Sequence, residues 1–156
     1  MRERMEVADV HGGSTVALSL SDLGAEAGTV VRVILVVDDD DPVRVMLARL
    51  LRTQGYSVLQ AANAAEARKL LEADEPPDLI ISDIVMPGES GMEFRRYVSE
   101  LWPDLPVILV SGYSAEGPAE FAAKTANTMF VQKPFAADQL LTLVERTLAG
   151  HRQLGL

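Results

Sequence analysis

One short stretch indicates the fold class: residues 33–39 read VILVVDD, five apolar residues followed directly by two aspartates. Four of the five are β-branched and no polar residue alternates with them, which is typical of a strand buried on both faces of a parallel sheet. Residues 79–81 (LII) and 107–110 (VILV) share this character. Residues 57–61 and 128–132 are shorter candidates for strands nearer the edges. The sequence therefore predicts five strands.

Amphipathic segments alternate with these strands. Apolar residues recur at helical spacing in three of them: Val43, Met46, Leu47, Leu50 and Leu51; then Phe94, Tyr97, Val98 and Leu101; then Leu140, Leu141, Val144 and Leu148. The segment 116–126 is the weakest helix candidate, because a Gly-Pro pair stands near its start, and we expect it to be short. Five strands alternating with five helices predict an α/β, three-layer (βα)5 sandwich with right-handed crossovers. The pattern leaves the strand order open.

Three helix starts carry recognisable capping signals. Asp41 before Pro42 predicts an N-cap followed by proline at the first helical position. Two pairs have the spacing of a capping box: Asn63 with Glu66, and Ser90 with Glu93.

Composition excludes several classes of function. The 156 residues carry a formal net charge of −9 and no cysteine. The negative charge disfavours direct binding to nucleic acid or an anionic membrane, and the lack of cysteine excludes disulfides and thiolate sites. The longest apolar stretch, residues 30–37, is interrupted by Arg32 and is too short to span a bilayer. No apolar signal segment is seen at the start, so we expect a cytoplasmic protein.

Polar side chains follow the predicted strands, where a parallel sheet binds its ligands. Asp38 and Asp39 end the first strand, Asp83 the third, Ser111 the fourth and Lys133 the fifth. Three carboxylates held together repel one another, and a hard cation such as Mg²⁺ relieves that repulsion while keeping a position for phosphate. The lysine and the serine hydroxyl can contact phosphoryl oxygens, and aspartate is a known covalent acceptor of phosphate. The pattern predicts a phospho-aspartyl site.

Four motifs in this order resemble those of response-regulator receiver domains of two-component systems, most closely the C-terminal receivers of hybrid sensor histidine kinases. They are ILVVDD at 34–39, DIVMP at 83–87 with Gly91, Ser111-Gly112, and KPF at 133–135. The resemblance runs from about residue 33 to residue 150. It implies a flavodoxin-like sheet in the order 2-1-3-4-5 and a cis bond between Lys133 and Pro134.

The resemblance also implies a role for each site residue. Asp83 is the phosphoacceptor and, with Asp38, Asp39 and the backbone carbonyl of Val85, a Mg²⁺ ligand. Lys133 contacts the phosphoryl group, and Ser111 and Phe130 are the switch residues. Two positions that modulate phosphate lifetime in the family are Val85 and Tyr113 here, and neither can orient an attacking water, so we expect slow autodephosphorylation. The implied partners are a sensor histidine kinase or histidine phosphotransfer protein, as phosphohistidine donor, and a downstream protein target.

The chain divides into three parts by composition. Residues 1–31 predict an N-terminal extension or linker, residues 32–150 the receiver domain and residues 151–156 a C-terminal tail. Residues 12–20 are similar to the last strand of a histidine-kinase ATPase domain, and residues 106–113 resemble receivers fused to such kinases. These similarities favour the receiver of a hybrid kinase over a free-standing receiver. No other ATP-binding motif is present, so we expect a phosphate acceptor rather than an enzyme.

Two other classes remain as alternatives. Haloacid-dehalogenase-type phosphatases also place two aspartates after the first strand, and Asp38 and Asp40 have that spacing. That family places Thr or Val at the position that Pro42 occupies here, and it has no use for the motif beginning at Asp83. The other alternative is an inactive, receiver-shaped docking module, which the complete acidic set disfavours.

Overall fold

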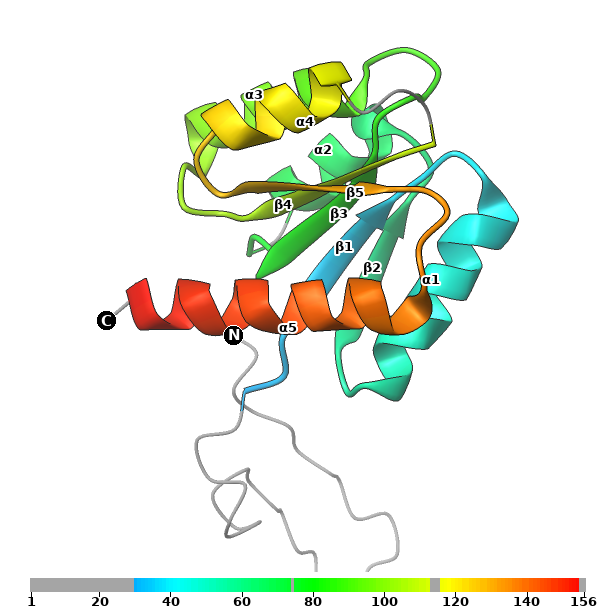
Figure 1. Ribbon diagram of the computed structural model, residues 1–156, viewed down its shortest axis with the longest axis vertical. Coiled ribbons are helices and arrows are strands. Elements are labelled where there is room, and N and C mark those ends of the chain that lie inside the picture. The colour runs from blue at the N-terminus through cyan, green and yellow to red at the C-terminus, as the bar shows by residue number, and fades with distance from the viewer. Residues whose placement is uncertain (1–29, 74, 113–115, 155–156) are drawn as a thin grey trace, which may run out of the picture. The chain divides into compact units, whose positions relative to one another are not determined.

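The computed structural model describes residues 30–73, 75–112 and 116–154. Within these residues five strands alternate with five helices, as predicted (Figure 1). The elements in order are β1 (Val33–Val37), α1 (Asp41–Thr53), β2 (Ser57–Ala61), α2 (Ala64–Ala73), β3 (Leu79–Asp83), α3 (Gly91–Leu101), β4 (Val107–Ser111), α4 (Glu116–Lys124), β5 (Thr128–Gln132) and α5 (Ala137–Leu154). The predicted strand-like stretch at residues 12–20 lies outside the described part of the chain. Helix α4 is nine residues long, which agrees with the short helix expected there.

The strands form one parallel sheet in the order β2-β1-β3-β4-β5. This is the flavodoxin-like order that the resemblance implied. Strands β1, β3 and β4, which have the most continuous apolar runs, occupy the interior of the sheet. Strands β2 and β5 lie at its edges, as their shorter runs predicted. Of the described helices, none is both long and apolar enough to cross a lipid bilayer.

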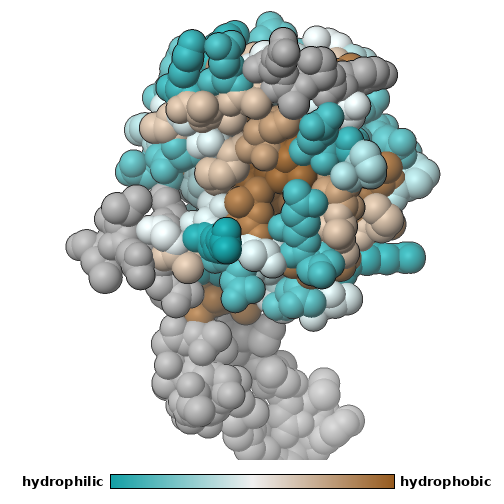
Figure 2. Space-filling model, in the orientation of Figure 1, coloured by the Kyte–Doolittle hydropathy of each residue, from teal (hydrophilic) through white to brown (hydrophobic). Residues whose placement is uncertain are grey.

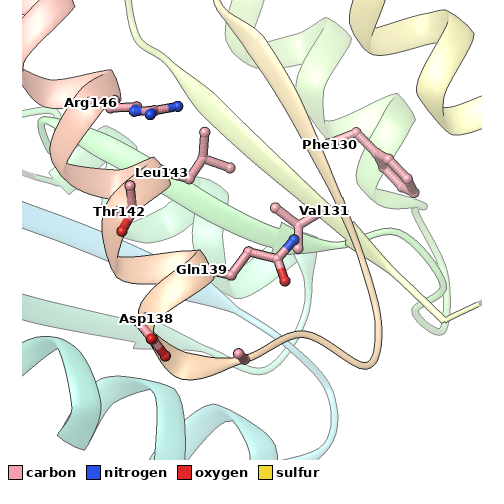
Figure 3. Close-up of a pocket in the computed structure, with 8 residues that line it drawn as sticks. Phe130, Val131, Asp138, Gln139, Thr142, Leu143 and Arg146 are labelled. Carbon is pink, nitrogen blue, oxygen red and sulfur yellow. The ribbon is translucent and has the colours of Figure 1, made fainter.

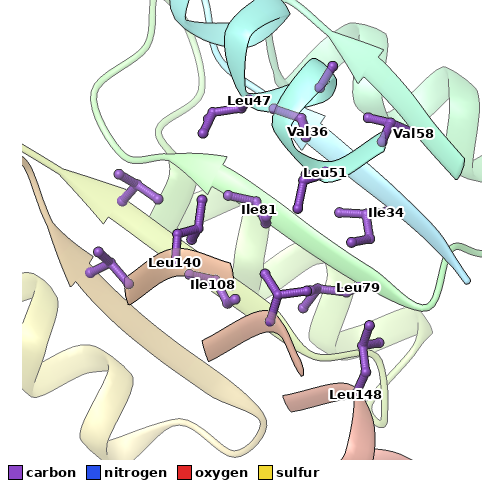
Figure 4. Close-up of a cluster of buried hydrophobic side chains, with 14 residues drawn as sticks. Ile34, Val36, Leu47, Leu51, Val58, Leu79, Ile81, Ile108, Leu140 and Leu148 are labelled. Atoms are coloured by element: carbon purple, nitrogen blue, oxygen red, sulfur yellow. The ribbon is translucent and has the colours of Figure 1, made fainter. Parts of the chain in front are cut away.

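Both faces of the sheet are covered by helices, and this explains why the central strands lack polar alternation. Successive strand residues point to opposite faces. Ile34 and Val36 therefore join the core on the side of α1 and α5, which Figure 4 shows. Leu35 and Val37 join a second core on the side of α2, α3 and α4. Each interior strand stabilises two cores at once.

The face between α4 and α5 has an open pocket where β5 passes between these helices. Figure 2 shows apolar side chains gathered on this face. The pocket is lined by Phe130, Val131, Ala136, Asp138, Gln139, Thr142, Leu143 and Arg146. Edge strand β5 is therefore incompletely covered on this side.

The helix starts differ from prediction in two details. The N-cap of α1 is Asp40, whose carboxylate accepts a bond from the N–H of Val43, so the prediction of Asp41 was wrong by one residue. Asp41 is instead the first helical residue and pairs with Arg44 at 2.7 Å. In α2, the amide N–H of Glu66 donates to Asn63, but its carboxylate accepts from the N–H of Ala62 rather than of Asn63.

The capping box of α3 forms as predicted. The Ser90 hydroxyl accepts from the N–H of Glu93, and the Glu93 carboxylate accepts from the N–H of Ser90, both at 3.1 Å. Two backbone donors at the helix start are thereby satisfied reciprocally. This matters for function because α3 begins directly after the loop that follows Asp83.

Three helical residues are buried or exposed contrary to what the helical spacing of apolar residues predicts. Met46 and Leu101 are 58% and 54% exposed, although helical spacing placed both in the core. Arg95, which the spacing left outside the stripe, is 1% exposed. Its Nε donates to the hydroxyl of Thr128 at 2.7 Å and a terminal nitrogen to the carbonyl of Ala126 at 2.8 Å. Burial lowers the pKa of Arg95 to about 10. This arginine ties α3 to the start of β5.

Candidate functional site

The register of the sheet brings the predicted site residues to one edge. Val37 pairs with Ser82, so Asp38 and Asp83 follow side by side. Strand β4 pairs Val110 with Asp83, which places Ser111 one residue further along the same edge. Lys133 follows strand β5, and its N–H donates to the carbonyl of Ser111 at 2.7 Å. The four strand ends that the sequence singled out therefore meet.

The acidic cluster has the composition of a site for a hard cation. Carboxylate oxygens of Asp38, Asp39 and Asp83 all lie within 4.8 Å of one another. Asp38 is buried, the Asp83 side chain is 12% exposed, and Asp39 is exposed to solvent. Oxygen donors grouped in this way, with one side open, suit Mg²⁺, which keeps water or phosphate oxygens among its ligands.

Lys133 is the cation that faces this cluster. Its Nζ lies 3.8 Å from an oxygen of Asp38 and 3.7 Å from an oxygen of Asp83. One ammonium group thus offsets part of the charge of three carboxylates. The peptide bond between Lys133 and Pro134 is cis, as predicted.

Burial and charge raise the pKa of both inner carboxyls. The pKa of Asp83 rises from 3.8 to about 6, first because the carboxyl is withdrawn from water and second because Asp38 is close, while Lys133 acts in the opposite direction. Burial likewise raises the pKa of Asp38. The site is therefore under electrostatic strain that a divalent cation would relieve.

Backbone donors and one arginine fix the positions of the carboxylates. The N–H of Asp40 donates to Asp38 at 2.9 Å, and the N–H of Ile84 donates to Asp83 at 3.0 Å. The guanidinium of Arg44 donates to the backbone carbonyl of Asp38 at 2.8 Å while it pairs with Asp41. Sequence reasoning missed Arg44; the only signal was its spacing of three residues from Asp41 on one helix.

Gly91 allows α3 to start against the backbone of Asp83. A Cβ on residue 91 would lie 2.2 Å from the carbonyl oxygen of Asp83 and 2.9 Å from the Cα of Ile84. The N–H of Gly91 donates to the carbonyl of Ile84 at 2.9 Å. Only glycine permits this approach without displacing the strand end that carries Asp83.

Comparison with known proteins assigns the chain. A family model for the response regulator receiver domain matches residues 34–145. The chain belongs to this family. It is 36% identical over 116 residues to the sensor kinase CckA of Brucella abortus, a match covering 74% of this chain and 12% of CckA. It is 33% identical over 121 residues to the transcriptional regulator NtrC of Escherichia coli, a match covering 78% of this chain and 26% of NtrC.

The receiver also resembles solved structures of the family. The crystal structure of a response regulator receiver domain protein from Clostridium thermocellum matches with a TM-score of 0.74 and 28% identity, over 80% of this chain and 99% of that one. This chain spans only 12% of the length of CckA and 26% of the length of NtrC. Membership of the family excludes the haloacid-dehalogenase alternative. Consistent with this, Asp40 serves as the cap of α1.

Ser111 and Phe130 lie on the same face of the receiver's sheet. Leu109 pairs with Phe130 across β4 and β5, and Ser111 is two residues after Leu109, so all three point to the side of α4. Ser111 is 2% exposed, and Phe130 is half-buried against the core on that side. In Figure 3, Phe130 points away from the side chain of Val131 and from α5. The two predicted switch residues therefore lie on neighbouring strands, offset by two residues, which is about 7 Å along the strand direction.

Of the two residues predicted to govern phosphate lifetime, the structure describes one, Val85. Val85, two residues after Asp83, is 57% exposed. Tyr113 lies outside the described residues.

Proposed function

We propose that this receiver accepts a phosphoryl group on Asp83 in a Mg²⁺-dependent reaction with a phosphohistidine donor. The observation that carries the proposal is the meeting of Asp83, the two acidic residues after β1 and Lys133 at one edge of a receiver sheet. With a pKa of about 6, Asp83 is mostly ionised at pH 7 and can act as a nucleophile.

The transfer follows from the placement of these groups. A carboxylate oxygen of Asp83 forms the new O–P bond as the N–P bond of the donor breaks, and the electron pair of that bond stays on the donor imidazole. Asp38, Asp39, Asp83 and the carbonyl of Val85 would hold Mg²⁺, which supplies charge neutralisation for the phosphoryl oxygens. The ammonium of Lys133 is placed to contact a phosphoryl oxygen, since it already lies 3.7 Å from Asp83.

We propose Ser111 and Phe130 as the pair that reports phosphorylation. Their shared face supports this, because a hydroxyl drawn toward the phosphoryl group would leave space on the side where Phe130 packs. The surface formed by α4, β5 and α5 would then change shape and alter the binding of a downstream protein.

The partners and the setting are also proposals. The donor is a sensor histidine kinase or a histidine phosphotransfer protein. We assign residues 32–150 to the receiver, with residues 1–31 as a linker and 151–156 as a tail. The likeness to the sensor kinase CckA supports the receiver of a hybrid kinase, whereas the likeness to NtrC shows that the same module occurs in transcriptional regulators.

Mass spectrometry after incubation with acetyl phosphate tests the chemistry. The wild type should gain one phosphate that requires Mg²⁺, and Asp83→Asn should gain none. Asp104→Asn is the matched control, because it makes the same change at an exposed residue in the loop between α3 and β4. Absence of an adduct on the wild type under every condition would contradict the proposal and favour a docking module without phosphotransfer.

A further inference from the structure

An arginine on α2 forms hydrogen bonds with the loop that follows Asp83. The Nε of Arg68 donates to one carboxylate oxygen of Glu89 at 3.0 Å, and a terminal nitrogen donates to the other oxygen. This is a two-point contact of the kind that fixes orientation as well as distance. Glu89 lies six residues after Asp83, in the loop between β3 and α3.

Arg68 is itself held between two helices. Its guanidinium carbon lies 3.8 Å from the ring centroid of Tyr97 on α3. The hydroxyl of Tyr97 donates to Glu72, one turn further along α2, at 3.1 Å. The ring of Tyr97 also stacks on Phe94, with centroids 6.2 Å apart. A planar cation on an aromatic face, with its donors directed at one carboxylate, loses little further freedom.

Among the described residues, the loop between Asp83 and α3 is held at both ends and at two points between them. Its two ends are fixed by the backbone bonds of Ile84 and Gly91. Between them Met86 is buried, but Val85 is 57% exposed and Gly88 adopts a φ of 81°. Glu89 provides the side-chain ion pair that joins this loop to α2.

We propose that Arg68 is a positioning residue for the phosphorylation site: through Glu89 it holds the loop so that the carbonyl of Val85 faces the acidic cluster. This inference rests on the proposed function, because it assigns Val85 as a ligand of the bound Mg²⁺. It adds a residue on α2, fifteen positions before Asp83, that neither touches the metal nor contacts the phosphoryl group.

The direction in which the Mg²⁺ affinity changes when Arg68 is removed distinguishes positioning from simple electrostatics. Removing a cation near an anionic site should strengthen binding of another cation, because a repulsive charge is lost. Loss of positioning should instead weaken Mg²⁺ binding, because the carbonyl ligand must be ordered again on binding. Lys69 is an exposed cation on the same helix, next to Arg68 in sequence. Lys69→Ala therefore makes the same change in net charge without changing the contact to Glu89.

The experiment measures the Mg²⁺ dissociation constant by calorimetry and the rate of phosphorylation by acetyl phosphate. Arg68→Ala should weaken Mg²⁺ binding roughly three- to tenfold and slow phosphorylation at limiting Mg²⁺. Saturating Mg²⁺ should restore most of the rate. Arg68→Lys should recover part of the affinity, because a single-point contact to Glu89 remains. Lys69→Ala should bind Mg²⁺ as tightly as the wild type or slightly more tightly.

A second readout uses metal-free protein. Amide hydrogen exchange in EDTA should be faster over residues 84–90 in Arg68→Ala than in Lys69→Ala, while exchange in the central strands stays the same. If Arg68→Ala binds Mg²⁺ as tightly as Lys69→Ala, or leaves exchange in the loop unchanged, the positioning role is overturned. If the wild type neither binds Mg²⁺ nor accepts phosphate, the proposed function fails, which is a distinct result.

Discussion

The raised pKa of Asp83 predicts that the ionised Asp83 carboxyl lowers the folding stability of this receiver. A change in pKa from 3.8 to about 6 corresponds to about 3 kcal/mol, at about 1.36 kcal/mol per pH unit. The folded protein holds the Asp83 proton more tightly than the unfolded chain does, so folding stability falls as pH rises from about 4 to above 6. Above that window the ionised carboxyl destabilises the fold. An amide of the same shape lacks this charge.

Asp83→Asn should therefore be more stable than the wild type by about 2 to 3 kcal/mol at pH 8 in EDTA. The difference should shrink below pH 6 and vanish near pH 4, where the wild-type carboxyl is protonated. Urea unfolding at several pH values, followed by circular dichroism, measures it. Asp104→Asn, which makes the same change at an exposed residue, is the matched control. Equal stability of wild type and Asp83→Asn at pH 8, or a difference that grows as the pH falls, would refute the reasoning.

Three further predictions concern the same edge of the sheet. Gly91→Ala should lower the free energy of unfolding in urea by about 1 to 3 kcal/mol, because the added methyl group would lie 2.2 Å from the carbonyl oxygen of Asp83. Gly150→Ala is the control: a Cβ at residue 150 has open space around it, so this substitution should raise the free energy of unfolding by about 0.5 to 1 kcal/mol. Ser111→Ala should still accept phosphate but show a weaker change in hydrogen exchange over α4, β5 and α5; an unchanged response would contradict the switch. Phosphorylated wild type should lose its phosphate slowly when followed by mass spectrometry, and a half-life of seconds would refute the roles given to Val85 and Tyr113.

Magnesium should reverse part of the stability difference caused by Asp83. At ten times its dissociation constant, a ligand that binds only the folded state stabilises it by about 1.4 kcal/mol. Thermal unfolding with and without Mg²⁺ should show this gain in the wild type and a smaller one in Asp38→Asn. Equal gains in both proteins would argue against Asp38 as a ligand.

Much of this receiver follows from local sequence alone. The apolar runs at β1, β3 and β4 predict buried parallel strands, because a strand covered on both faces carries consecutive apolar residues, whereas a strand with one exposed face alternates apolar and polar residues. The polar residues that end these strands predict a shared site, since the carboxyl ends of parallel strands meet at one edge. Both signals are contained in a few adjacent residues. The strand order came from the resemblance to receivers, because periodicity carries no information about which strands are neighbours.

Tertiary structure decided features that depend on which surfaces meet. Asp40 caps α1 instead of Asp41 because the chain turns one residue earlier than the proline suggested. Arg95 is buried, against the helical pattern, because Ala126 and Thr128 around the start of β5 offer it acceptors. Met46, which the same pattern placed in the core, is exposed. The contact of Arg68 with Glu89 joins residues 21 apart in the chain. Helical periodicity describes a single element, whereas these contacts depend on packing between elements distant in sequence.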